Sequence, residues 1–186
     1  MVVAKPQQTL TREDWLTAAL EALEESGAEG LKVLPLARRL GVSRGSFYWH
    51  FRDRGELLAA VLDYWDRWST QIVIDTLDTS SEDPASRLLA LMEMVTERRL
   101  THYDPAVRAW AVRDADAARV VRRVDRRRLA YVTGLFRKAG FAAAEADGRA
   151  RLFVVYLSTE AIFFAREPAA RRRQLLRLCH RVLTAR

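Results

Sequence analysis

Residues 34–51 are predicted to form two short helices joined by a tight turn, and this stretch constrains the fold most. Leu36 and Leu40 lie four apart and mark the apolar stripe of the first helix. Gly41 follows at the position where helices often end in the left-handed conformation. Ser43 suits the N-cap of the second helix, since its hydroxyl can accept a bond from a free backbone N–H. The stretch therefore predicts a helical hairpin with a sharp corner.

The second helix of this hairpin has two contrasting faces. Phe47 and Phe51 are four residues apart, so they share one face and are expected to point inward. The opposite face carries small, aromatic and basic side chains, which is unusual for a surface that meets only water. It suits the major groove of DNA, where arginine, serine and tryptophan can read base edges and a phenol or imidazole can reach phosphates. The candidate DNA-binding residues are Arg44, Gly45, Ser46, Tyr48, Trp49 and His50, with Arg54 at the start of the next helix as a phosphate contact.

The charge pattern favours a polyanionic partner only near this hairpin. The chain has a net charge of +7, but residues 1–69 hold 9 Lys+Arg against 10 Asp+Glu. Residues 31–55 alone hold 6 basic side chains and one acidic one, a net charge of +5. The helix before the hairpin is acidic, and most of the arginines at 119–128 and 166–186 are expected to be solvated. Local basicity therefore supports the helix-turn-helix prediction, whereas the total charge is weak evidence.

The rest of the chain predicts an all-α fold of 186 residues. Residues 1–8 are expected to be a disordered leader, and Thr11 with Asp14 predicts a capping box at the first helix. A second capping box, Asp53 with Glu56, opens a long helix with an apolar stripe that continues past residue 69. Further helices are expected after Pro84, after Pro105, and at about 116–138, 143–166 and 168–185. The boundaries expected are 1–8, 9–69 with the motif at about 32–51, and 70–186.

Composition and the few reactive side chains point away from an enzyme. The three histidines are far apart and give no helical metal-ligand spacing, so neither a metal nor a cofactor is expected. No glycine-rich phosphate loop and no nucleophile elbow occurs. No stretch is apolar enough to span a membrane, no secretory signal opens the chain, and the single Cys179 suits a reducing compartment. The expected location is the cytoplasm.

The run GVSRGSFYWHFRDRGELL is specific enough to indicate a family. With LARRL before it and TREDWLTAALEALEESGAEGL before that, it resembles the N-terminal DNA-binding domain of the TetR/AcrR family of transcriptional regulators, over about residues 9–69. The resemblance implies a three-helix helix-turn-helix domain, joined by the long helix to a C-terminal helical domain for ligand binding and dimerisation. Double-stranded operator DNA and a small effector are the implied partners, and repression is the implied activity.

Dimer and effector sites follow from the resemblance and from the apolar content of the C-terminal part. The segment LFVVYLSTEAIFF is apolar nearly all round, and family members pair their last two helices across a two-fold axis. The predicted dimer interface is Leu152, Val155, Tyr156, Thr159, Phe163, Leu175, Leu178 and Val182. A pocket for a hydrophobic or flat effector is expected among Trp65, Trp68, Met92, Tyr103, Trp110, Tyr131 and Phe153, with a polar anchor from Arg108, Glu97 or Glu160.

Two other functions stay open on the sequence. The chain could be a helical small-molecule-binding protein or enzyme whose DNA-binding domain is vestigial. It could also coat nucleic acid without sequence preference through its arginine-rich helices, in which case binding would collapse with salt. Binding to the chain's own upstream DNA separates these from a sequence-specific regulator.

Overall fold

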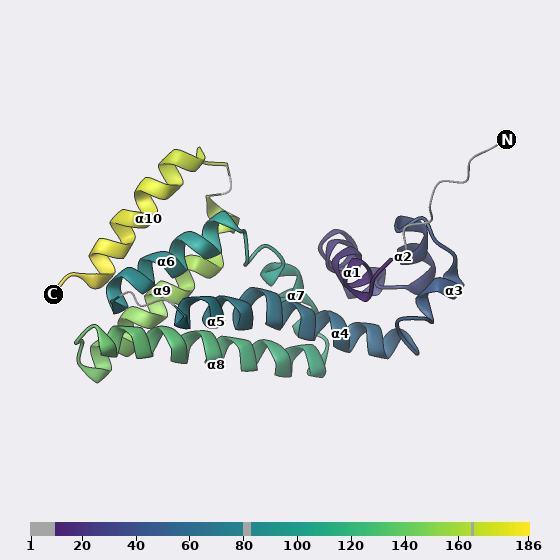
Figure 1. The fold of residues 1–186 in the computed structure, drawn as a ribbon, viewed down its shortest axis with the longest axis horizontal. Coiled ribbons are helices and arrows are strands. Elements are labelled where there is room, and N and C mark those ends of the chain that lie inside the picture. Colours follow the sequence, from purple (N-terminus) through teal and green to yellow (C-terminus); the bar gives the residue numbers. More distant parts are fainter. Residues whose placement is uncertain (1–9, 80–82, 165) are drawn as a thin grey trace. The chain divides into compact units, whose positions relative to one another are not determined.

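The computed structural model describes residues 10–79, 83–164 and 166–186. Within these ranges every regular element is helical, which confirms the predicted all-α class. The expected leader at 1–8 lies outside the described residues. The elements are α1 Arg12–Ser26, η1 Ala28–Gly30, α2 Val33–Arg39, α3 Arg44–Phe47, α4 Arg54–Asp66, η2 Arg67–Gln71, α5 Ile72–Asp78, α6 Pro84–Glu97, α7 Asp104–Ala111, α8 Ala115–Lys138, α9 Ala143–Phe163 and α10 Ala169–Thr184 (Figure 1).

The chain divides into two compact units, Met1–Tyr64 and Trp65–Arg186. In the first unit, Thr11 and Asp14 form the predicted capping box, with Asp14 N–H donating to the Thr11 hydroxyl at 3.2 Å and Thr11 N–H to the Asp14 carboxylate at 2.7 Å. An aromatic cluster fills the core: the rings of Trp15 and Phe47 meet edge-on with centroids 5.5 Å apart. Phe51 stacks on Phe47 at 5.2 Å. Both phenylalanines are buried, as their spacing predicted.

The corner between α2 and α3 has the predicted backbone conformation but lacks the predicted side-chain cap. Gly41 has φ of +68°, the left-handed conformation expected after α2. Ser43 is the N-cap residue of α3, as predicted, but its hydroxyl does not make the predicted capping bond. The backbone carbonyl of Ser43 instead accepts from Ser46 N–H at 3.1 Å.

The start of α4 has half of the predicted capping box. Asp53 accepts from the backbone N–H of Glu56 at 2.8 Å. The Glu56 carboxylate does not return to Asp53 but accepts from Arg52 N–H at 2.9 Å and from the Arg52 guanidinium at 3.0 Å. The bond from the Arg52 backbone N–H has the largest effect, and together with the bond from the guanidinium it holds the pKa of Glu56 below its ordinary value. Arg52, which the capping-box pattern did not predict, therefore helps Asp53 to stabilise the start of α4.

The long helix expected after Asp53 is not regular throughout. α4 passes at Arg67 into a π-helical turn, η2, before α5 begins at Ile72. Ile72 N–H bonds to the carbonyl of Arg67, five residues back instead of four. Ser69 and Thr70, which lie within this turn, are both buried.

The second unit is a helical bundle with one apolar core. α8 packs against α6, α7 and α9, and α10 packs on α6 (Figure 1). The core is drawn from α5, α6, α8, α9 and α10, with Phe136 and Phe153 meeting edge-on at 6.1 Å in its middle. Among the described residues, no helix is long and apolar enough to cross a membrane.

Most arginines of α8 are exposed, as expected, but three of them also bond to buried carboxylates. Arg123 and Arg127 both bond to Asp66, whose residue exposure is 6%. Arg128 bonds to Asp104, which is 1% exposed. The partners lie 24 to 61 residues away along the chain, so no local charge pattern could reveal them.

Candidate functional site

α3 and the turn after it present the side chains proposed to meet DNA. Arg44, Gly45, Tyr48 and Trp49 are exposed, with Tyr48 at 50% and Trp49 at 88%. Because 88% of the surface of Trp49 is exposed, its indole contributes little to the packing of the first unit. Ser46 is half-buried beside them. Phe47 between them anchors the surface, so the exposed groups stand on a rigid base.

Arg44 and Tyr48 are coupled across one turn of this surface. The Arg44 guanidinium donates to the Tyr48 hydroxyl at 3.1 Å and lies 5.9 Å from the centre of its ring. This contact limits the freedom of a long side chain, so less entropy is lost when it binds a base. A guanidinium in this position can donate two parallel bonds to guanine O6 and N7. The neighbouring phenol remains able to donate to a phosphate.

Gly45 is not required by the packing of the described residues. A Cβ placed there would meet only Ser43 Oγ, at 3.6 Å, which is ordinary van der Waals contact. The backbone at Gly45 is therefore open to a close approach from outside. This is what a helix pressed into a DNA groove needs.

His50 and Arg54 both also contact other residues of the first unit. The His50 carbonyl accepts from Arg12 Nε at 3.5 Å, and its ring lies 6.4 Å from that of Trp15. Arg54 donates from Nε to the carbonyl of Leu31 at 2.7 Å and from Nη2 to that of Ala28 at 3.0 Å. Arg54 thereby ties α4 to the turn before α2. Arg54 is nevertheless exposed, so the phosphate contact expected of it stays a prediction.

The comparisons with known proteins bear on this surface directly. The profile described as "Bacterial regulatory proteins, tetR family" matches residues 16–61. The N-terminal domain belongs to the TetR family. Over 52 residues the chain is 42% identical to the class D tetracycline repressor of Escherichia coli, covering 28% of this chain and 24% of that protein. Over 91 residues it is 28% identical to the regulator AcrR of Shigella flexneri, covering 49% of this chain and 41% of that one.

These matches span less than half the length of the curated relatives. A solved structure extends the likeness in fold to the whole chain. It is a transcriptional regulator from Rhodococcus sp. Rha1, with a TM-score of 0.67, 23% identity, and 94% of each chain covered. At this identity the likeness concerns the fold alone. The TetR-family match thus rests on the N-terminal domain, and for the helical bundle after it the likeness is one of fold.

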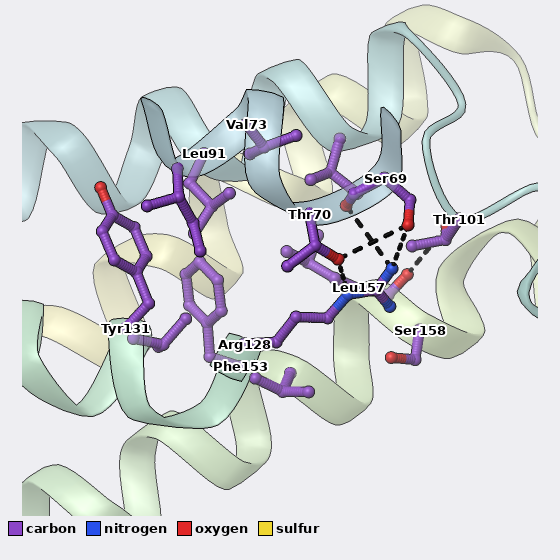
Figure 2. Close-up of a pocket in the computed structure, with 14 residues that line it drawn as sticks. Ser69, Thr70, Val73, Leu91, Thr101, Arg128, Tyr131, Phe153, Leu157 and Ser158 are labelled. Atoms are coloured by element: carbon purple, nitrogen blue, oxygen red, sulfur yellow. Dashed lines mark hydrogen bonds between the residues drawn. The ribbon is translucent and has the colours of Figure 1, made fainter. Parts of the chain in front are cut away.

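The second unit contains a cavity between α5, η2, α6, α8 and α9 (Figure 2). Its volume is about 50 Å³, enough for several waters, since one water needs about 10–15 Å³. Most of the lining is aliphatic or aromatic. The lining residues are Ser69, Thr70, Val73, Ile74, Leu91, Val95, Thr101, Arg128, Tyr131, Val132, Phe153, Val154, Leu157 and Ser158.

The cavity shares only two residues with the predicted pocket, Tyr131 and Phe153. The others do not line it. Trp65, Met92 and Trp110 are buried in the packing of the unit. Trp68 and Tyr103 lie against each other, with ring centroids 6.4 Å apart.

None of the three expected polar anchors lines this cavity either. Arg108 is paired with Asp125 at 2.6 Å, and Glu160 with Arg172 at 2.5 Å. Glu97 is exposed. The polar groups that do line it include Arg128, Ser69 and Thr70, which the sequence reasoning missed. The one available signal was a Ser-Thr pair inside the apolar stripe of a long helix.

The outer faces of α9 and α10 expose an apolar surface. On α9, Leu152 is 64% exposed and Phe163 73%. On α10, Val182 is 65% exposed. Most of the predicted dimer residues are on this surface: Leu152, Val155, Phe163, Leu178 and Val182 are exposed, and Tyr156, Thr159 and Leu175 are half-buried.

Proposed function

We propose that this protein is a sequence-specific DNA-binding transcriptional regulator, a repressor that a small effector releases from its operator. The observation that carries the proposal is the exposed surface of α3 on a domain of the TetR family. Arg44, Ser46 and Trp49 contact base edges in the major groove, and Tyr48 and His50 contact the backbone. The effector acts only as far as it binds the DNA-free form better than the DNA-bound form.

Fluorescence anisotropy with labelled DNA from upstream of the protein's own gene tests this. The wild-type chain should bind one fragment far more tightly than a scrambled duplex. Trp49→Ala should remove that preference. Arg119→Ala is the matched control, since it removes an exposed positive charge from α8 and should leave the preference intact. Equal affinity for both duplexes, falling steeply with salt, would instead show non-specific coating. No binding at all would favour the helical small-molecule-binding protein with a vestigial DNA-binding domain.

We further propose that the protein is a two-fold homodimer through α9 and α10. The support is the exposed apolar stripe on both helices, since monomers rarely leave large contiguous apolar patches in water. A two-fold dimer carries two copies of α3, so the operator should be a palindrome with half-sites about one helical turn apart or somewhat more. Light scattering at micromolar concentration measures the mass. A monomeric mass would refute the dimer.

A further inference from the structure

We propose that the exposed face of α8 is a second DNA-binding surface, which contacts the phosphate backbone of a duplex without reading its sequence. Arg122 and Arg126 are the side chains that bind, beside Arg119 in the same row. The inference rests on the DNA-binding part of the proposed function, because the domain that carries α3 brings duplex DNA to the protein. It adds a contact in the second unit, where the likeness to known proteins concerns the fold alone.

Three arginines of α8 form one row along the helix. At about 100° per residue, Arg119, Arg122 and Arg126 point within an arc of about 60°. All three are exposed. The first and last are separated by about 10 Å along the helix axis, at a rise of about 1.5 Å per residue. Phosphates follow one another about every 3.4 Å along the axis of a DNA strand, so the row spans about three phosphate steps.

Other arginines of α8 hold the helix in the orientation that turns this row outward. α8 packs against α6, α7 and α9 and lies at an edge of the second unit (Figure 1). Arg123 and Arg127 bond to the buried Asp66 at 3.0 Å each, and Arg128 bonds to the buried Asp104. These bonds fix the rotation of α8 about its own axis. They also use the buried carboxylates, so the row is not neutralised by them.

The positive charge of the row is available to a partner. Among the residues that the structure describes, the side chains of Arg122 and Arg126 make no hydrogen bond or ion pair. Arg119 pairs with Asp116 one turn earlier, but the two side chains are 69% and 75% exposed. An exposed pair of this kind contributes about 0–1 kcal/mol, so a phosphate can replace the carboxylate. The row therefore offers two unpaired guanidinium groups and one that is weakly paired.

The chemistry of this face selects one partner among the anionic ones. α8 is described throughout, and it exposes no large apolar or aromatic side chain. Helices that lie on anionic membranes need an apolar face, and surfaces that bind single strands need aromatic rings for stacking. Tight protein interfaces are anchored by aromatic and arginine side chains in well-packed, desolvated pockets. The backbone of a duplex requires only positive charge, so duplex DNA is the partner that this face fits.

Fluorescence anisotropy of the full chain on a scrambled duplex, from about 50 to about 200 mM salt, tests the proposal. Arg122→Gln/Arg126→Gln should lower the slope of the logarithm of the association constant against the logarithm of salt concentration by about 1.8, since each phosphate contact contributes about 0.9. Binding at the lowest salt should weaken roughly tenfold or more. Arg98→Gln/Arg173→Gln is the matched control, because it removes the same charge from two exposed arginines outside α8 and should leave the slope nearly unchanged.

A measurement on the wild-type chain locates the contact directly. The Nε–H NMR signals of Arg122 and Arg126, assigned by their absence in the double variant, should move when the scrambled duplex is added. Unmoved signals, or equal slopes in the two double variants, would overturn the proposal. Tighter binding to poly-glutamate or to vesicles that contain anionic lipid, lost in the α8 variant, would assign the face to another partner and also overturn it. Failure of the proposed function looks different, since the wild-type chain would then bind operator and scrambled duplex alike while the two double variants still differed in slope.

Discussion

Replacing Asp104 with alanine should destabilise the second unit strongly. Asp104 is 1% exposed and accepts bonds from Arg128 and from the indole N–H of Trp65. Its removal leaves a guanidinium with 13% side-chain exposure without its carboxylate partner. Breaking a buried pair from one side costs about 3–5 kcal/mol, because the remaining charge stays buried. Ser69 and Thr70 still bond to Arg128, so the lower half of that range is expected.

A second ion pair joins the same two helices and supplies the control. Arg108 on α7 pairs with Asp125 on α8, but both side chains are far more exposed, at 38% and 40%. Asp125→Ala should therefore cost about 0–1 kcal/mol, as solvated pairs do. The double variant Asp104→Ala/Arg128→Met should recover part of the loss, because no charge is then left buried alone.

Thermal and urea unfolding followed by circular dichroism measures these differences. A loss of about 3 kcal/mol should lower Tm by roughly 6–12 °C in a chain of this size. Separate transitions for the two units would have to be fitted separately, since a single free energy is defined only for one cooperative transition. If Asp104→Ala costs no more than Asp125→Ala, burial does not set the strength of these pairs and the reasoning fails.

Four further predictions concern DNA binding, the stability of the first unit, assembly and ionisation. Arg44→Ala should weaken operator binding by about 1–3 kcal/mol and relax the preference at one base position, as measured by fluorescence anisotropy. An unchanged base preference in this variant would contradict the prediction. Arg54→Ala should lower the free energy of unfolding of the first unit by about 1–2 kcal/mol, as measured by urea unfolding. Val155→Glu should yield monomers by light scattering, and a dimeric mass would place the interface elsewhere. Burial first, then the bond to Asp78, raises the pKa of Tyr131 to about 12. Its stabilising effect should be complete below pH 10 and lost as pH rises from about 10 to about 12, and ultraviolet titration against Tyr131→Phe should show the late-ionising phenol.

Local sequence patterns determined the helices and the corner of the helix-turn-helix. Helical periodicity depends on side chains within one or two turns, so the apolar spacing of Phe47 and Phe51 was enough to place both inside. Gly41 showed where α2 ends, because glycine adopts a positive φ at no steric cost. The exposed face of α3 follows from the same periodicity, since a helix that buries one face leaves the other in solvent.

Only the tertiary structure decided which polar groups meet across the chain. Most arginines at 119–128 were expected to be solvated, yet the bonds of Arg128 to Thr70 and Ser69 span 58 and 59 residues. Arg54 was expected to contact a phosphate, and it also bonds to carbonyls 23 and 26 residues earlier. A long, flexible basic side chain can reach many partners, and its own neighbours in sequence do not determine which one it takes. The π-turn at 67–71 also depends on distant residues, because Ser69 and Gln71 within it bond to arginines of another helix.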